Sequence, residues 1–445
     1  VVSGGADIVH YGVSGFRLQA NGNTYSGTIT SNLGEIRADT GDTTTANNPY
    51  DTITALNLRN SALRLNFPNA AGTAPNIADS RFSTTAPISM RASIIYVDNA
   101  SFSTTSTNFF DYALAQTFGV TTLEGGGNKI VTRSADAGSV TLTFTDLLRP
   151  NPATMLELQI DNLSGGATAE WGASAKHRIL NSALETGGVS VPFVGGWAFY
   201  DREFLEYDPV NVVGGFGYNK LDTADQAVDT SEGTWGTGQN IRITSGNRTL
   251  PINTSINSLN MRSASGRTLT GTAGATLEVE SGGILTSDAT HTISVPFLTA
   301  GAASNYELYD IAWSSNNIFS DITDNSGNPV SLVKAGSGTT SFFANNSYSG
   351  TTYIVEGQFR DVIGAPTYTA LGSGNLNMVG DADSQGVYDT DRDFVRALGT
   401  GAGEVQLTGG GGFASGSTGF SAYGAPIDLN FGGAGATVTW GTPTF

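Results

Sequence analysis

The chain is built from short segments in which apolar and polar residues alternate, and this alternation is the strongest constraint on its fold. Successive side chains of a β-strand point to opposite faces, so each segment predicts a strand with one apolar face. Gly, Asn, Asp and Ser interrupt the pattern at short intervals, as is typical of turns. So small an apolar face does not stabilise a strand alone, and we expect each strand to stack on others of its kind. The segments are 56–58, 63–67, 140–144, 277–279, 405–407, 427–431 and 438–440.

One polar phrase occurs twice. Residues 346–361 read NSYSGTTYIVEGQFRD, and residues 23–39 read NTYSGTITSNLGEIRAD. Asn346 aligns with Asn23, and the same offset of 323 (346 minus 23) aligns the other identities without a gap. The shared residues are Asn23/Asn346, Tyr25/Tyr348, Ser26/Ser349, Gly27/Gly350, Thr28/Thr351, Gly34/Gly357 and Arg37/Arg360.

A second phrase is also repeated, with a different offset. Residues 53–62 (ITALNLRNSA) match 256–265 (INSLNMRSAS) at an offset of 203 (256 minus 53), and Leu-Asn-Met returns at 376–378. We interpret the two offsets as a composite repeat made of coils of roughly 20 to 25 residues. This pattern predicts an all-β fold, a right-handed parallel β-helix (β-solenoid) whose coils stack at about 4.8 Å. An array of β-sandwiches is the structural alternative, although it does not need repeated phrases.

Composition excludes several classes of function. Asp and Glu outnumber Lys and Arg by 39 to 21, and the net charge is −18. Phosphate binding needs a cationic surface, so nucleic acid and anionic membrane surfaces are not expected partners. The chain has no Cys, and therefore neither disulfides nor thiolate metal sites. It also has no run of apolar residues long enough to span a membrane as a helix.

One stretch departs from this rhythm. Aromatic residues interleaved with acidic ones gather at 186–240, where we expect longer loops or a wider part of the solenoid. We therefore predict solenoid coils at 1–185, an aromatic-rich bulge at 186–240 and further coils at 241–445, with no linker that separates independent domains. The aromatic residues are Phe193, Trp197, Phe199, Tyr200, Phe204, Tyr207, Phe216, Tyr218 and Trp235.

The repeated polar phrase, which ends in a Gly-x-apolar-Arg strand, resembles the autotransporter-associated β-strand repeat of bacterial passenger proteins. It spans 338–360, with a partial copy at 15–37 in which Ile29 stands at the position of Thr352. Further phrases resemble the long versions of these repeat proteins, namely 195-GGWAFYD-201, 281-SGGILTS-287, 394–414 and 418–441.

This resemblance implies a right-handed parallel β-helix on the outside of a bacterial cell, usually within a very large protein. It implies no catalytic residue for this chain. The repeated phrase then looks like a coil of scaffold, in which Asn and Gly form the bend, Tyr stacks and Thr contributes to strand and ladder.

Neither end of the chain reads as the cap that closes a solenoid. Residues 15–18 already belong to a repeat phrase, and residues 438–445 are still strand-like and apolar. An uncapped coil exposes unpaired backbone groups that invite another strand. We therefore expect the polypeptide to continue beyond both ends, or copies of it to stack end to end.

The densest acidic run, 381-DADSQGVYDTDRD-393, is a candidate calcium site. Asp381, Asp383, Asp389 and Asp391 would supply the carboxylate oxygens that this cation prefers. The run is not an EF-hand, because Arg392 stands where the bidentate Glu would fall. The structural alternative is a solvated loop whose charge is neutralised by arginine.

The aromatic-rich bulge is a candidate glycan contact. Trp197, Tyr200 and Tyr207 are the side chains that would stack on sugar rings. Because Trp197 belongs to the phrase GGWAFYD, a packed structural role is the competing interpretation.

Catalytic residues are not expected. The β-helical polysaccharide-degrading enzymes resemble one another in paired Asp residues with a Gly-His-Gly and an Arg-x-Lys. His10, His177 and His291 stand in no such context, and Arg-x-Lys does not occur. The sequence predicts no cofactor apart from the candidate calcium.

Three functions follow from these observations. The first is a structural, non-enzymatic segment of a large extracellular or cell-surface bacterial protein that forms a stiff rod, fibre or layer. The second is an adhesin or glycan-binding β-helix, and the third is a polysaccharide-degrading enzyme. The expected partners are further copies or the continuation of the same polypeptide, together with surface glycans in the second case.

Overall fold

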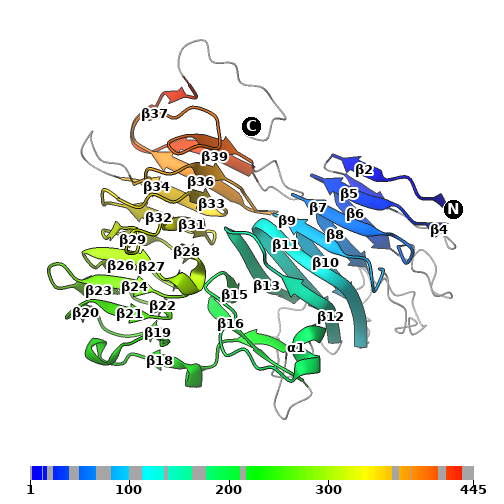
Figure 1. The fold of residues 1–445 in the computed structure, drawn as a ribbon, viewed down its shortest axis with the longest axis horizontal. Helices are drawn as coiled ribbons and strands as arrows, with labels where there is room; N and C mark the ends of the chain where they lie inside the picture. Colours follow the sequence, from blue (N-terminus) through cyan, green and yellow to red (C-terminus); the bar gives the residue numbers. More distant parts are fainter. Residues whose placement is uncertain are drawn as a thin grey trace. The chain divides into compact units, whose positions relative to one another are not determined.

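The structure is a computed structural model that describes residues 3–12, 14–17, 24–39, 50–66, 82–99, 113–134, 139–162, 177–210, 217–362, 370–381, 383–408 and 417–432. Regular structure in these ranges is almost entirely parallel β-strand (Figure 1). Antiparallel pairing there is confined to β15–β16–β17 and two isolated bridges. The prediction of an all-β, parallel β-helix is confirmed, and the β-sandwich alternative is wrong because successive coils pair in parallel.

The chain divides into two compact units. The described residues of unit 1 come from Val1–Val194 and Leu205–Lys220, and those of unit 2 from Gly195–Phe204, Leu221–Gly411 and Ser415–Phe445. The chain thus passes between the units at 194/195, 204/205 and 220/221, all within the segment predicted as an aromatic-rich bulge. The boundaries at 185 and 240 stay predictions.

In the described residues, the coils of unit 1 form two main sheets, and most coils contribute one strand to each. Sheet 1A consists of β2 (Ile8–Tyr11), β5 (Thr28–Asn32), β7 (Ala55–Arg59), β9 (Ile88–Arg91), the first part of β11 (Ala113–Ser134), β12 (Ser139–Leu148) and β14 (His177–Asn181). Sheet 1B consists of β3 (Gly15–Arg17), β6 (Glu35–Asp39), β8 (Ala62–Asn66), β10 (Ile94–Asn99), the second part of β11, and β13 (Thr154–Asn162). Beside them, β1 (Ser3–Gly4) pairs with β4 (Thr24–Tyr25).

In the described residues, the coils of unit 2 form three main sheets. Sheet 2A consists of β18 (Gln226–Val228), β19 (Asn240–Ile243), β22 (Ser258–Arg262), β25 (Gly283–Ser287), β28 (Glu307–Ala312), β31 (Ser331–Ala335), β33 (Thr352–Ile354), β35 (Leu376–Met378) and β38 (Val405–Leu407). Sheet 2B consists of β20 (Arg248–Leu250), β23 (Thr268–Gly271), β26 (His291–Ser294), β29 (Asn316–Ile318), β32 (Thr339–Phe342), β34 (Gly357–Asp361), β36 (Gln385–Thr390) and β39 (Ser417–Ala422). Sheet 2C consists of β21 (Thr254–Ile256), β24 (Thr276–Val279), β27 (Phe297–Ala300) and β30 (Asp321–Ile322), and β37 (Phe394–Val395) pairs with β40 (Leu429–Asn430).

The remaining elements are few and short. A meander consists of β15 (Ala198–Tyr200), β16 (Glu203–Asp208) and β17 (Gly217–Lys220). The described helices are α1 (Ser182–Gly187) and the 3₁₀ turns η1 (Thr223–Asp225), η2 (Glu232–Thr234) and η3 (Ala302–Ser304). Among the described residues, no helix is both long enough and apolar enough to cross a membrane.

Coil length differs between the units. In unit 2, Asp310 pairs with Lys334 and Lys334 with Ile354, and these offsets of 24 (334 minus 310) and 20 (354 minus 334) agree with the predicted coil length. In unit 1, Ile29 pairs with Leu56 and Leu56 with Ile88, and these offsets are 27 (56 minus 29) and 32 (88 minus 56). The predicted coil length is therefore wrong for these coils of unit 1, because their connecting segments are longer.

The corner between sheets 1A and 1B is formed by a left-handed residue in successive coils. Leu33, Asn60, Ala92, Gly126 and Ala153 have φ values of 66°, 49°, 46°, 67° and 53° at this corner. Residues with a Cβ adopt this region at a cost, and glycine is its usual occupant. At this corner the expectation that glycine fills the left-handed turns holds for Gly126, whereas stacked neighbours hold residues with a Cβ in the same conformation in the other coils.

The repeated phrases occupy equivalent places in their coils. The copy at 23–39 contains β5 and β6, and the copy at 346–361 contains β33 and β34. In each case the chain contributes a strand to one sheet, turns, and contributes a strand to the next. The Leu-Asn-Leu/Met triplets behave in the same way, since they lie on β7, β22 and β35, which belong to sheets 1A and 2A.

The shared tyrosine closes the bend that precedes these strands. Tyr25 and Tyr348 both point into the core and are buried. The Tyr25 hydroxyl donates to the carbonyl oxygen of Thr28 at 2.9 Å, and the Tyr348 hydroxyl lies 2.5 Å from Thr352 Oγ1. A buried phenol needs a hydrogen-bond partner, and the phrase provides one three or four residues later.

The shared glycine after this tyrosine allows the coil to approach its predecessor. A Cβ on Gly350 would lie 2.3 Å from the carbonyl oxygen of Val330, and one on Gly27 would lie 2.5 Å from that of Ala6. Gly350 N donates to the same Val330 oxygen at 3.0 Å. No side chain fits there, so the repeated glycine is explained by backbone contact between coils.

Aromatic side chains form a column in each unit. In unit 1, the rings of Phe118 and Phe144 stack with centroids 5.1 Å apart. In unit 2, Phe342 and Phe359 stack at 4.2 Å, and Tyr388 follows at 5.7 Å. Each ring comes from a different coil, so the core is continuous along each stack.

Asn346 links three coils of unit 2. Its Oδ1 accepts from Ile322 N at 2.9 Å, and its Nδ2 donates to Ala370 O at 2.6 Å. The side chain is buried, so both bonds are shielded from water. This amide explains the asparagine of the repeated phrase, because it satisfies backbone groups that would otherwise be unpaired.

We predict that Asn346→Ala lowers the free energy of unfolding by about 2–4 kcal/mol, because it leaves one buried donor and one buried acceptor unpaired. The measurement is chemical denaturation followed by intrinsic fluorescence. Asn317→Ala is the matched control, since this half-buried asparagine of β29 forms no side-chain hydrogen bond with the described residues. Equal stability losses in the two variants would contradict the prediction.

Candidate functional site

The tyrosines of the predicted glycan contact are packed inside the protein. Tyr207 has no exposed surface, and Tyr200 is 8% exposed. The Tyr207 hydroxyl donates to Glu185 Oε1 at 2.7 Å and accepts from Asn181 N at 3.0 Å. Burial, followed by the hydrogen bond to Glu185, raises the pKa of Tyr207. In this conformation Tyr207 offers no face to a sugar ring.

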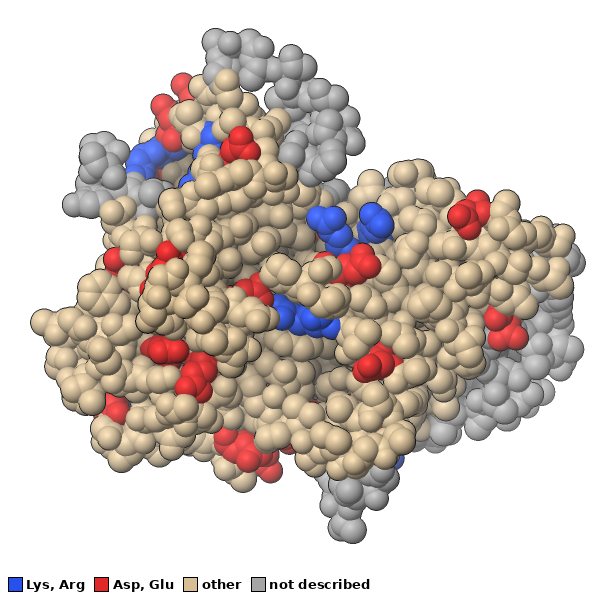
Figure 2. Space-filling view, viewed as in Figure 1, with Lys and Arg blue, Asp and Glu red and all other residues tan. Residues whose placement is uncertain are grey.

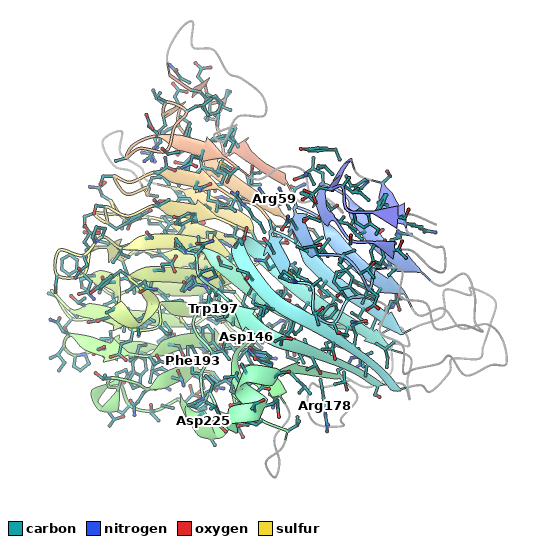
Figure 3. The ribbon with its side chains drawn as sticks, turned by 45° about the vertical axis from the view of Figure 1, so that its right-hand side comes forward. Arg59, Asp146, Arg178, Phe193, Trp197 and Asp225 are labelled. Carbon is teal, nitrogen blue, oxygen red and sulfur yellow. The ribbon has the colours of Figure 1, made fainter. Side chains whose placement is uncertain are left out.

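Trp197 belongs to a segment that covers the outer face of sheet 2A. Gly196 lies against the backbone of Gly283, where a Cβ would come within 2.4 Å of Gly283 N. Trp197, labelled in Figure 3, is half-buried. The family-like phrases 195–201 and 281–287 thus pack against each other. Trp197 stays a predicted glycan contact, now with a structural role beside it.

Glu203 fixes this segment to sheet 2A. Its Oε1 forms ion pairs of 2.9 Å with Arg242 and with Arg262, and its Oε2 accepts from Asn260 Nδ2 at 2.7 Å. The carboxylate is buried, and such a carboxylate needs this set of donors. This acidic residue of the predicted aromatic-rich bulge therefore has a structural role.

The predicted calcium residues do not converge on one point. Asp389 binds Arg360 at 2.6 Å, Asp391 pairs with Arg392 at 3.4 Å, and Asp381 Oδ1 accepts from Asp383 N at 3.2 Å. Within the described ranges, no group of three or more His, Asp or Glu side chains is arranged to hold a metal ion. The calcium site stays a prediction, and the arrangement of these side chains gives it no further support.

The charged side chains are spread thinly over the surface. Figure 2 shows most of one face without charge and several places where acidic and basic side chains adjoin. Arg64, for example, pairs with Asp98 at 3.4 Å, and Arg248 pairs with Asp229 at 3.2 Å. These pairs place positive charge beside a carboxylate and not beside further positive charge.

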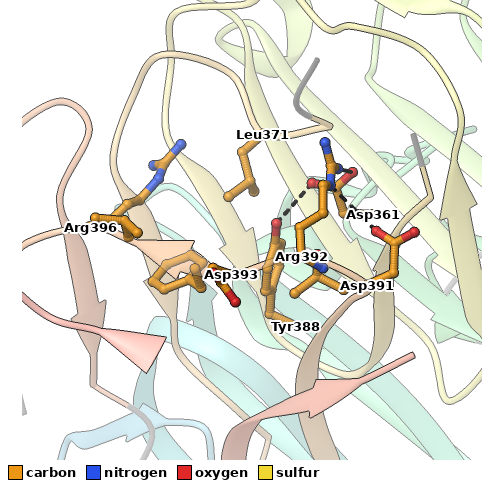
Figure 4. Close-up of a pocket in the computed structure, with 10 residues that line it drawn as sticks. Asp361, Leu371, Tyr388, Asp391, Arg392, Asp393 and Arg396 are labelled. Atoms are coloured by element: carbon orange, nitrogen blue, oxygen red, sulfur yellow. Dashed lines mark hydrogen bonds and ion pairs between the residues drawn. The ribbon is translucent and has the colours of Figure 1, made fainter. Parts of the chain in front are cut away.

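A cavity of about 590 Å³ lies beside the segment that follows β36 in unit 2 (Figure 4). This volume falls within the range of small-molecule sites. Acidic, basic and apolar side chains all line it, and each comes from β34, β36, β37 or the turns beside them. The lining residues are Asp361, Leu371, Tyr388, Thr390, Asp391, Arg392, Asp393, Phe394, Val395 and Arg396.

A buried carboxylate organises one wall of this cavity. Asp361 Oδ2 accepts from the Tyr388 hydroxyl at 2.9 Å, and Asp361 Oδ1 accepts from Arg392 Nη2 at 2.5 Å (dashed lines in Figure 4). Burial raises the pKa of Asp361, and the Arg392 guanidinium opposes this shift. Burial is also the main cause that raises the pKa of Tyr388, which therefore stays protonated and donates its hydrogen bond. The wall is held in place before any ligand arrives.

Arg396 is held by backbone groups. Its Nη1 donates to Gly374 O at 2.9 Å, and its Nη2 donates to Gly372 O at 3.1 Å. Burial lowers the pKa of Arg396, although a guanidinium keeps its proton at neutral pH. Both arginines of the cavity are thus engaged by groups of the protein.

Sequence analysis found only part of this site. The acidic run 381–393 included Asp391 and was expected to be neutralised by arginine, but the roles of Asp361 and Tyr388 were not predicted. Asp361 ends the second copy of the repeated phrase, so a signal was present, although the phrase was interpreted as scaffold alone. Asp361 and Arg392 are far apart in the sequence and meet because they lie on successive coils.

A second unforeseen polar group lies inside unit 2. Asp310 and Lys334 are paired positions of β28 and β31, both fully buried and both pointing inward. Lys334 Nζ donates to three carbonyl oxygens, Ala335 O at 2.6 Å, Gly336 O at 2.9 Å and Glu356 O at 3.2 Å. Burial lowers the pKa of Lys334 to about 8, and the nearby Asp310 carboxylate opposes this shift. The sequence 331-SLVKA-335 contained a signal for this buried lysine, because Lys334 lies two residues after Leu332 on the inward-facing side of the strand.

Comparison with known proteins gives one curated relative. No protein-family model matches the chain, and no solved structure matches it. The chain is similar to the adhesin BmaC autotransporter of Brucella suis biovar 1 (strain 1330), with 26% identity over 383 residues. The match covers 80% of this chain and 10% of the relative, so the chain spans about a tenth of that protein's length. The similarity is to an autotransporter-type adhesin, and the type of repeat stays a prediction.

We predict that the Asp310–Lys334 pair makes stability rise with pH above about 8. Between the folded pKa of about 8 and the usual 10.5, the folded protein has released the Lys334 proton and the unfolded chain retains it. The unfolded state then binds more protons, so the free energy of unfolding increases through this window, by up to about 3 kcal/mol.

The measurement is urea denaturation from pH 7 to 10.5 of the wild type and of the double variant Asp310→Asn/Lys334→Met, which has neither ionisable group. All other titrating groups are common to both proteins. The wild type should gain stability relative to the variant as pH rises, and a constant difference would show that Lys334 does not titrate in this way.

Proposed function

We propose that this chain is a scaffold segment of a cell-surface, adhesin-type passenger protein in which stacked solenoid coils act as a stiff spacer. The observation that carries the proposal is the coil-to-coil register. In unit 2, β22, β25, β28, β31, β33, β35 and β38 pair in parallel, one after another. Backbone hydrogen bonds therefore run along the stack, and bending it would break them.

The similarity to an autotransporter adhesin supports an extracellular or cell-surface location and an adhesive role for the protein that contains this segment. A rod, fibre or layer formed by continued or stacked coils is part of the same proposal. The match covers only a tenth of the relative, so the relative's adhesive activity is not assigned to this chain. We propose it only for the protein that contains this segment.

A non-enzymatic role is also proposed, and the environment of the histidines supports it. His177 is buried and its Nδ1 lies 2.8 Å from Thr132 Oγ1. His291 is fully buried, with Nε2 2.8 Å from Ser287 O and Nδ1 accepting from Arg267 N at 3.2 Å. Burial is the largest cause that lowers the pKa of His291, so this ring stays neutral. These imidazoles are used in contacts within and between coils.

We predict that display of this chain on a non-adherent bacterial strain increases attachment to cultured epithelial cells. The physical reason is that this solenoid presents its own exposed side chains, which an unrelated solenoid lacks, to the surface of the host cell. Attachment is measured by counting bound bacteria after washing. The control strain displays an unrelated β-solenoid of similar size at the same surface density. Equal attachment of the two strains would contradict the adhesive proposal.

We also predict that the purified chain does not cleave polysaccharides. The measurement is reducing-end release from pectin, alginate and β-glucan. Cleavage that is lost on replacing a single Asp with Asn would replace the scaffold proposal with an enzymatic one.

A further inference from the structure

The cavity beside β36 combines features that suit a ligand with many hydroxyl groups. We propose that it binds a neutral saccharide unit, with Asp391 and Asp393 accepting hydrogen bonds from sugar hydroxyls. This proposal rests on the proposed adhesive function, because it names the class of ligand that one surface of the segment would bind. It concerns residues of unit 2 alone.

The polar side of the cavity has acceptors to offer. Asp391 forms an ion pair with Arg392 but no hydrogen bond with the described residues, and its side chain is 36% exposed. Asp393 is exposed and uses Oδ1 to accept from Asp428 N at 2.8 Å, so Oδ2 has no partner among the described residues. Two carboxylate oxygens are thus available in the lining of a cavity that also contains the Asp361–Arg392 ion pair.

The apolar side suits the carbon-bound face of a sugar ring. Leu371, Phe394 and Val395 contribute to the lining, and Val395 is 66% exposed. Phe394 is itself held by Tyr388, with ring centroids 5.4 Å apart. Pockets that combine apolar walls with a few placed polar groups fix both the affinity and the orientation of a small molecule.

The same geometry disfavours charged ligands. An anion would need donors that are not already engaged, whereas Arg392 binds Asp361 and Arg396 binds two backbone carbonyls. An anion would also meet three carboxylates in the lining. A divalent cation would need several converging oxygens, and no such group is formed by the described residues. A neutral polyol, which both donates and accepts, meets neither obstacle.

The experiment is saturation-transfer difference NMR on the full chain. The neutral probes are methyl α-mannoside, methyl β-galactoside, fucose and N-acetylglucosamine, and the charged probes are glucuronic acid and N-acetylneuraminic acid. At least one neutral probe should receive saturation. In the variant Asp391→Asn/Asp393→Asn, the affinity for that probe should fall at least about tenfold, because two strong acceptors become neutral amides.

Asp225→Asn is the matched control, since Asp225 is an exposed carboxylate of unit 2 outside the lining (Figure 3). It should bind like the wild type, and thermal unfolding should show that all three proteins are folded. Saturation of no neutral probe, saturation of charged probes alone, or equal binding by the double variant would each overturn the proposal. Attachment of displaying bacteria without sugar binding would overturn the saccharide site alone. Sugar binding without attachment would overturn the adhesive function alone.

Discussion

Parallel backbone hydrogen bonding between successive coils is the interaction on which the rest of this structure depends. Most described strands have six residues or fewer, so none has enough surface to be stable alone. Once a strand pairs with its equivalent in the next coil, each inward side chain meets a counterpart, as Phe342 meets Phe359. The same constraint acts on polar groups, because a buried amide or ammonium must find its partners in its own coil or in a neighbouring one. Asn346 and Lys334 both do so.

The sequence predicted the features that are local to one coil. Alternation of the kind seen at Leu56 and Leu58 identifies a strand and its buried face, and both side chains are fully buried. The repeated phrases identify equivalent strands, because a stacked coil restricts its residues in the same way wherever it occurs. The number of sheets per coil could not be predicted. It depends on corners such as those at Leu33 and Ala92, where residues without a turn preference are held left-handed by their neighbours.

The candidate site was harder to predict for a related reason. A cluster of aromatic residues in the sequence suggested a binding surface. Tyr207, however, is buried in the core and its hydroxyl is hydrogen-bonded to Glu185 and Asn181. The cavity beside β36 instead joins residues that are distant in sequence and adjacent in the stack, such as Asp361 and Arg392. The sequence shows that both are charged, but it does not show which coils lie next to each other. Register is a property of the folded stack, so a site between coils becomes visible only in the structure.

A solenoid also determines where function is easiest to place. Inside a coil, a departure from the apolar pattern must be compensated within the stack, and Lys334 illustrates this with three carbonyl partners and a nearby carboxylate. At a turn, a departure costs little, because the side chains there are not required for stacking. Asp391 and Asp393 lie in such a turn, at the end of a strand whose own residues Tyr388 and Thr390 stay buried. The rigid stack thus supplies a fixed wall, and the turn supplies side chains that are available to a ligand. This division lets the chain acquire a binding surface without disturbing the ladder that holds its coils together.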